Sequence, residues 1–151
     1  MKPLLALVFL ALTPLGVMAQ TTDDADETPP ETSVMRPDEV DLQQFIWKKR
    51  PVIVLADSPN DPRFIQQMSF LEAEIDDLAK RDVVILTDTD PEARSPLREK
   101  LHPRGFMLVL IGKDGGIKLR KPLPWDVREL SRAIDKMPMR QQEIQDRRGL
   151  N

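Results

Sequence analysis

Three short runs of apolar residues constrain the fold of this chain most strongly. They are Pro51–Ala56, Val83–Thr87 and Phe106–Ile111. Each run is short and rich in Val, Ile and Leu, which is typical of strands buried on both faces of a sheet. Helix signals fill the segments between the runs. The order strand, helix, strand, helix, strand therefore predicts an α/β domain with at least one parallel pair.

Two proline-containing signals mark where the helices begin. Asp61-Pro62 and Ser95-Pro96 each place a capping side chain before a proline at the first helical position. After Pro62, apolar residues recur at helical spacing until the chain reaches Lys80 and Arg81 (Phe64, Met68, Leu71, Ile75 and Leu78). This stripe predicts one amphipathic helix, and Ser95 predicts a second, short helix that ends near His102.

The last part of the chain predicts a hairpin and a final helix. Lys113–Gly116 reads as a tight turn, so Ile117–Lys121 is expected to pair antiparallel with the strand before it. An amphipathic helix from Val127 to Met137 follows, and Pro138 is expected to stop it. Together these elements follow the chain order β-α-β-α-β-β-α. This order predicts a four-stranded mixed sheet with helices on both faces, which is the thioredoxin-like core.

The first 39 residues predict export followed by a spacer. Lys2, the apolar run Leu4–Leu15 and Val17-Met18-Ala19 have the three-part build of a secretory signal peptide, residues 1–19, with cleavage between Ala19 and Gln20. Residues 20–39 are rich in Asp, Glu, Thr and Pro, which favours a disordered acidic leader. The domain is expected over 40–140 and a polar tail over 141–151. The mature chain is expected in the periplasm or outside the cell, with no membrane insertion.

The chain contains no cysteine. Thiol chemistry is therefore excluded, and the fold must form without disulfides. The formal net charge is −3, and the chain divides into an acidic leader and a mildly basic body, since residues 42–151 carry a net charge of +3. This body lacks the strong basic bias of a nucleic-acid-binding protein. His102 is the single histidine, which makes general acid–base catalysis by histidine improbable. No cofactor motif is present, and no cofactor is expected.

Four segments resemble one family of proteins: Phe45–Pro51, Arg81-Asp82, Leu110–Lys118 and Ile134–Glu143. It is a thioredoxin-like domain of unknown function in exported bacterial proteins. It is similar to the peroxiredoxin-like P-DUDES domain of animal sushi-repeat and coiled-coil-containing matrix proteins. The resemblance covers about Val40 to Glu143 and implies a fold and a secretory setting. It implies no established activity.

The resemblance also implies where thioredoxin chemistry would lie. Thioredoxins carry a Cys-x-x-Cys pair in the turn after their first core strand, and Asn60 and Arg63 occupy those two positions here. The position of the thioredoxin cis-proline falls near Met107. Both hallmarks are missing, so neither thiol oxidoreductase nor thiol peroxidase activity is expected.

One candidate site lies beyond the carboxyl ends of the parallel strands, where ligands tend to bind in open α/β sheets. The residues expected there are polar (Asp57, Ser58, Asn60, Arg63 and Asp88, with Asp90 and Glu92 nearby). Arg63 would favour an anion, while the carboxylates would favour a hard cation such as calcium. Taken one at a time, these residues are better explained by helix capping, strand ends and turns, and no resident metal is expected.

A second candidate is a docking surface. Lys118 and Arg120 share one face of the fourth strand, and with Met137, Met139 and Arg140 they could form a patch that binds a partner. The alternatives are an edge strand protected by its charges and a methionine in the core.

These observations favour a non-catalytic binding or interaction module. Its expected partner is an unknown protein or small molecule of the envelope, and not nucleic acid. The alternative is an enzyme without cysteine that uses the strand-edge carboxylates, with or without a metal ion. A structural or stress-protection protein of the envelope is a third hypothesis.

Overall fold

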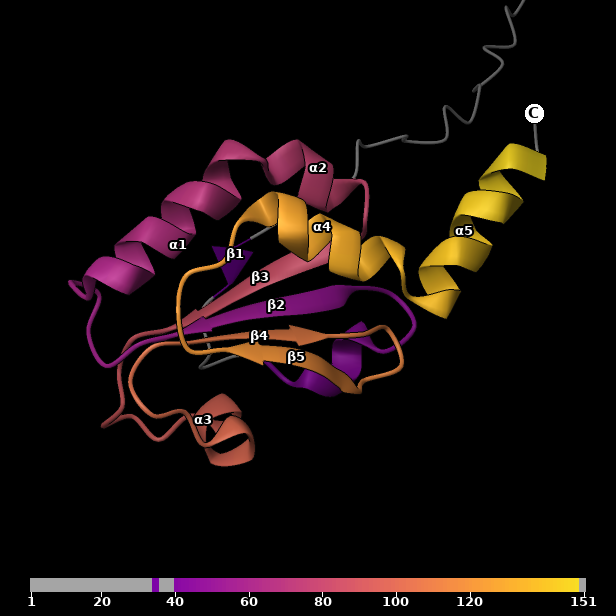
Figure 1. Ribbon diagram of the computed structural model, residues 1–151. Coiled ribbons are helices and arrows are strands. Elements are labelled where there is room, and N and C mark those ends of the chain that lie inside the picture. Colours follow the sequence, from indigo (N-terminus) through magenta and orange to yellow (C-terminus); the bar gives the residue numbers. More distant parts are fainter. Residues whose placement is uncertain (1–33, 36–39, 150–151) are drawn as a thin grey trace, which may run out of the picture.

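The fold is a five-stranded mixed sheet covered by helices on both faces (Figure 1). The computed structural model describes residues 34–35 and 40–149, so the predicted signal peptide and most of the predicted leader lie outside the described residues. The sheet order is β1-β3-β2-β4-β5. The strands are β1 (Val34–Met35), β2 (Arg50–Leu55), β3 (Val83–Asp88), β4 (Met107–Ile111) and β5 (Ile117–Lys121).

The pairing is parallel on one side of the sheet and antiparallel on the other. Strand β3 runs parallel to both β1 and β2, whereas β4 runs antiparallel to β2 and to β5. The predicted hairpin and the predicted parallel pair are therefore both present. The end of the sheet where β2 and β3 finish is here called the carboxyl end, and the end where they begin is called the amino end.

The fifth strand corrects the sequence prediction. Residues 20–39 are predicted to be a disordered leader and the sheet to have four strands, yet Val34 and Met35 pair with Ile85 and Leu86 of β3. Met35 packs against the buried cluster on one face of the sheet. These two residues add apolar surface and backbone donors to the outer edge of β3, which the prediction leaves unpaired.

One face of the sheet is covered by three helices: α1 (Pro62–Ala73), α2 (Ile75–Ala79) and α4 (Val127–Asp135) (Figure 1). Side chains alternate along the strands, so Val52 and Val54 pack toward this face while Ile53 and Leu55 pack toward the other. Leu71 and Leu78 are fully buried against Val52 and its neighbours.

The predicted single helix after Pro62 is two helices. Its backbone leaves the helical region at Glu74, with φ −123° and ψ 31°, and α2 begins at the next residue. The apolar stripe continues across this break, because both helices bury their apolar residues against the same sheet face.

The opposite face carries the short helix η2 (Leu42–Phe45) and α3 (Pro96–Leu101). Both predicted caps are present. The side chain of Asp61 accepts a hydrogen bond from the backbone nitrogen of Arg63 at 2.9 Å, and Ser95 accepts one from Arg98 at 3.3 Å. The prolines after these caps are the first helical residues, as predicted.

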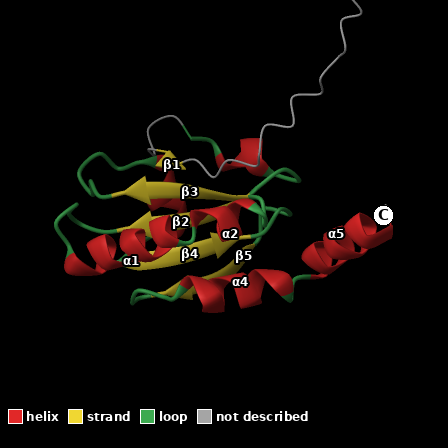
Figure 2. Ribbon diagram, turned by 90° about the horizontal axis from the view of Figure 1, so that it is seen from above, coloured by secondary structure: helices red, strands yellow, loops and turns green. Residues whose placement is uncertain are grey.

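The end of the chain also differs from the prediction. Helix α4 ends at Asp135, and Pro138 begins a further helix, α5 (Pro138–Gly149). A proline fits the first position of a helix, where its missing N–H would have no partner. Helix α5 projects beyond the amino end of the sheet (Figure 2). Among the helices that the structure describes, none is both long and apolar enough to cross a membrane.

Candidate functional site

The carboxyl end of the sheet contains a buried ion pair. The carboxylate of Asp88 lies 2.9 Å from Nε of Arg98, and it also accepts hydrogen bonds from the Ser95 hydroxyl and from the backbone nitrogen of Asp90. Arg98 donates in addition to the carbonyls of Ala56 and Asp88. Both partners are buried. Asp88, a predicted ligand residue, therefore has its oxygens engaged in holding α3 to the ends of β2 and β3.

The other four predicted ligand residues lie together outside this ion pair. Asp57, Ser58, Asn60 and Arg63 line one open hollow of about 450 Å³, with Asp61 and Pro62 completing it. The Asp57 side chain is 62% exposed and lies 3.8 Å from Arg98. The Ser58 hydroxyl accepts a hydrogen bond from the backbone of Asn60 at 3.1 Å. The sequence thus predicted these neighbours correctly, although Asp88 does not open into the hollow with them.

Arg63 is held by groups of the chain itself. It donates two hydrogen bonds to Asp61, at 2.9 and 3.1 Å, and its guanidinium lies 5.8 Å from the centre of the Phe106 ring. The hydrogen bond from Arg63 is the largest cause that lowers the pKa of Asp61. Across residues 34–35 and 40–149, no group of three or more His, Cys, Asp or Glu side chains is placed to hold a metal ion.

The amino end of the sheet contains a larger network of charges. Arg50, the first residue of β2, is fully buried, and its guanidinium binds the carboxylate of Glu143 at 2.9 and 3.3 Å. It also donates to the carbonyl of Arg81 at 2.9 Å. The amine of Lys113 lies 2.8 Å from Glu143 and 2.8 Å from Asp82. Glu143 of α5 is therefore bound to the start of β2 and to the β4–β5 turn.

Another carboxylate, that of Asp135 at the end of α4, extends this network. Asp135 accepts hydrogen bonds from Arg81 at 2.8 and 3.0 Å, and Arg140 lies within 3.4 Å of Asp135 and 3.3 Å of Glu143. Burial alone would raise the pKa of Glu143, but hydrogen bonds and charge from Arg50 and Lys113 outweigh it and lower the pKa from 4.5 to about 2. The carboxylate is thus ionised at neutral pH.

The segments that carry the family resemblance converge on this network. Each of the four motifs contributes to it: Phe45–Pro51 supplies Arg50, Arg81-Asp82 supplies both of its residues, Leu110–Lys118 supplies Lys113, and Ile134–Glu143 supplies Asp135, Arg140 and Glu143. Sequence reasoning named Arg140 as a docking residue and did not place it in this network. The one available signal was that basic and acidic residues recur inside the four motifs.

Three of the five predicted docking residues meet at this end. Lys118, Met137 and Met139 line one pocket of about 210 Å³ together with Arg50, Gly112, Lys113, Asp114 and Pro138. Arg140 is buried in the ion-pair network. Arg120 is engaged elsewhere, since its guanidinium donates to the carbonyl of Leu101 at 2.6 Å. The predicted patch is therefore a pocket with a charged floor, and Arg120 does not line it.

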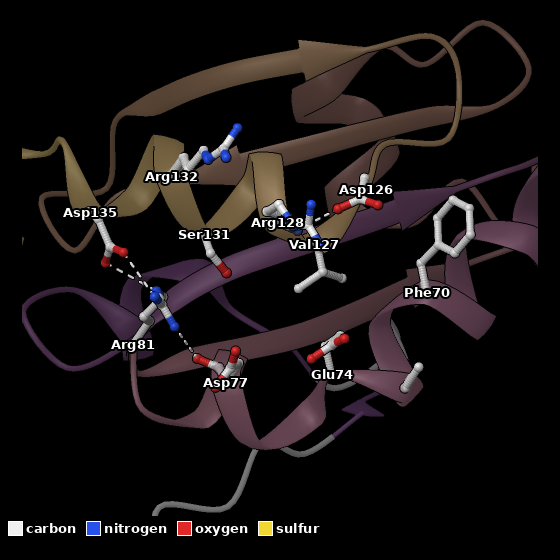
Figure 3. A pocket seen from close by; sticks show the side chains of 11 residues that line it. Phe70, Glu74, Asp77, Arg81, Asp126, Val127, Arg128, Ser131, Arg132 and Asp135 are labelled. Atoms are coloured by element: carbon white, nitrogen blue, oxygen red, sulfur yellow. Dashed lines mark hydrogen bonds and ion pairs between the residues drawn. The ribbon is translucent and has the colours of Figure 1, made fainter.

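A third hollow, of about 440 Å³, lies between α1–α2 and α4 (Figure 3). Arg81 and Asp135 face each other at one end of it, and Phe70 and Val127 lie toward the other. Several of its lining charges already have partners: Arg81 binds Asp135, Arg132 binds Glu129, and Asp126 caps α4. The sequence analysis did not anticipate this hollow, and its mixed charges favour no particular class of ligand.

Solved structures with a similar fold are peroxiredoxins. The reduced 2-Cys peroxiredoxin of Plasmodium vivax matches with a TM-score of 0.56 and 16% identity, over 68% of this chain and 85% of that chain. Prx1a of Plasmodium yoelii, modified at its N-terminus, matches with a TM-score of 0.53 and 17% identity, over 68% and 81% of the two chains. At these identities the likeness shows the peroxiredoxin- and thioredoxin-like fold alone.

The sequence itself matches a family model across most of the described fold. The match spans residues 41–143, from the turn before η2 to the carboxylate that binds Arg50. Its last residue, Glu143, lies beyond the predicted domain boundary at residue 140. This chain belongs to the family described as "Domain of unknown function (DUF4174)".

Proposed function

We propose that this protein is a non-catalytic, thioredoxin-like interaction module that is exported to the periplasm or secreted and binds a protein partner at the amino end of its sheet. The observation that carries the proposal is the pocket lined by Lys118, Met137 and Met139. The absence of cysteine from the sequence supports it, because the two positions of the thioredoxin pair hold Asn60 and Arg63.

The size of the pocket favours a protein partner over a small molecule. Its volume of about 210 Å³ is below the range of about 300–1,000 Å³ that is usual for small-molecule sites. A pocket of this size fits one anchoring side chain, which is how interface hot spots are commonly built. The two methionines at its rim have flexible, polarisable side chains that adapt to such an anchor.

The floor of the pocket is rigid. Arg50 and Lys113 line the pocket and are both bound to Glu143, so their positions are fixed before any partner arrives. The lining comes from β2, the β4–β5 turn, β5, the link between α4 and α5, and the first residues of α5, which lie at one end of the sheet (Figure 1). A preformed pocket lowers the entropic cost of binding.

The alternative function, an enzyme that uses the strand-edge carboxylates, has no comparable support. Asp88 is engaged with Arg98 and Ser95, and Asp57 points into an open hollow. If the purified protein turned over a substrate, and if Asn60→Ala or Arg63→Ala abolished that turnover, the proposal of a non-catalytic module would be wrong.

Site-specific photo-crosslinking tests the proposal. A photoreactive amino acid replaces Met139 in the full chain, which is expressed in cells of the source organism and irradiated. The matched control carries the same group at Arg128, an exposed residue of α4 outside the pocket. We expect a discrete crosslinked protein from position 139, absent from position 128 and lost when Met137→Asp is added. Identical products at both positions, or none at 139, would contradict the proposal.

A further inference from the structure

Basic residues dominate the pocket at the amino end of the sheet. Arg50, Lys113 and Lys118 line it, and the carboxylate of Asp114 is the one acidic side chain in its lining. The network below the pocket has the same excess, since four cations share three carboxylates (Arg50, Arg81, Lys113 and Arg140 with Asp82, Asp135 and Glu143). The local potential at this end is therefore positive.

Further cations lie next to pocket residues in the sequence. Lys48 and Lys49 directly precede Arg50, and Lys136 directly precedes Met137. Lys48 and Lys136 are exposed and Lys49 is half-buried. None of the three forms an ion pair with a carboxylate of the described residues. Their charge is thus available to a ligand, in contrast to the paired charges of the network.

One buried donor at this site lacks an acceptor. Nε of Arg50 is the only buried side-chain nitrogen or oxygen within residues 34–35 and 40–149 that has no hydrogen-bond partner. A buried donor without an acceptor destabilises a fold, and such groups call for an explanation. Arg50 lines the pocket, so an acceptor bound there is one such explanation.

An exposed tryptophan adjoins the pocket through its backbone. The backbone nitrogen of Trp47 donates to the carbonyl of Lys113 at 2.7 Å. Trp47 is 66% exposed and has φ +65°, a conformation that is uncommon for residues other than glycine and that often marks functional sites. Exposed tryptophan is also the residue type most enriched at interface hot spots.

We infer that the partner binds through an acidic segment that places a carboxylate in this pocket and an apolar side chain beside Met139 and Trp47. Lys118 is 36% exposed and pairs with Asp114 at 2.8 Å, so the incoming carboxylate competes with Asp114 for its amine. The buried guanidinium of Arg50 adds positive charge below it. This inference rests on the proposed function, because it names the chemistry of the partner at the same pocket. Complementary charge is what selects this occupant over a neutral or basic one.

A pair of peptides tests the inference directly. Fluorescein-labelled dodecapeptides of alternating Glu and Leu, and of alternating Gln and Leu, are titrated with the full chain and followed by fluorescence anisotropy. We expect the Glu peptide to bind at least tenfold more tightly at low salt, with an affinity that falls as salt rises. Lys118→Gln should weaken it severalfold and flatten the salt dependence. Arg128→Gln, the matched loss of one charge outside the pocket, should leave the affinity unchanged.

The outcomes separate this inference from the proposed function. Equal affinity for the two peptides, or an unchanged affinity in Lys118→Gln, overturns the acidic partner, while a specific crosslink from position 139 would still support the module. If the crosslink from position 139 maps to a basic or neutral segment of the partner, to a second copy of this chain or to its own residues 20–33, the inference is overturned as well. Absence of a crosslink from position 139, by contrast, would contradict the proposed function itself.

Discussion

The two ends of the sheet use charge in different ways. At the carboxyl end, the charges of Asp88 and Arg98 satisfy each other in the interior, and the hollow outside is open and shallow. At the amino end, Arg50 and Glu143 form part of a network that reaches the surface and lines a pocket. In thioredoxins the chemistry lies at the carboxyl end. In this chain that end stabilises the fold, and the pocket with the more specific lining lies at the opposite end.

The largest expected effect comes from breaking the ion pair at the carboxyl end. Asp88→Asn leaves the buried Arg98 guanidinium with only the exposed Asp57 carboxylate, 3.8 Å away, as a countercharge, and breaking a buried pair typically costs about 3–5 kcal/mol of unfolding free energy. Urea denaturation followed by circular dichroism measures this loss. Asp57→Asn is the matched control at the same end, because Asp57 is exposed and 3.8 Å from Arg98, so about 1 kcal/mol or less is expected. Similar losses in both variants would show that the pair does not anchor α3.

The next effect belongs to the amino end and depends on pH. The pKa of Glu143 is about 2 in the folded chain and about 4.5 when it is unfolded, so its contribution to stability is fully present above pH 4.5. The contribution is lost as the pH falls from 4.5 toward 2, because protonation releases Arg50 and Lys113. The Glu143 side chain is 21% exposed, so solvent screening reduces this contribution below the roughly 3 kcal/mol that the full shift would give.

Glu143→Gln tests this dependence. The variant should be less stable than the parent chain at pH 7, and its unfolding free energy should change less between pH 4.5 and pH 2. Glu129→Gln is the matched control, since Glu129 pairs with Arg132 on the exposed face of α4. If Glu143→Gln and the parent chain lost stability in parallel over this range, the network at the amino end would not govern acid unfolding.

The sequence predicted the parts of the fold that depend on local pattern. The branched apolar runs indicated β2, β3 and β4, and Asp61 and Ser95 indicated where α1 and α3 begin, because strand burial and capping are read over a few neighbouring residues. The break at Glu74 and strand β1 were missed. A helix break leaves the apolar period intact, and two residues are too few for a strand signal.

The amino-end network could not be predicted from the sequence for a different reason. Arg50 and Glu143 are separated by 93 positions, and nothing in local periodicity pairs two charges across that distance. A fully buried arginine is rare unless it is paired, so the fold had to bring a carboxylate to it. The docking residues were predicted in part because Lys118, Met137 and Met139 stood out by type, while Arg120 was included by strand alternation alone.

The smallest expected effect sharpens the contrast between the ends. Arg63 occupies a position of the missing thiol pair, is 46% exposed, and contacts only Asp61 and the Phe106 ring among the described residues. Exposed ion pairs and cation–π contacts of this kind contribute little, so Arg63→Gln should change the unfolding free energy less than either of the substitutions above. It should leave the anisotropy of the acidic peptide unchanged, because the peptide binds at the other end. A marked loss of peptide affinity in Arg63→Gln, with stability preserved, would move the binding surface back to the thioredoxin position.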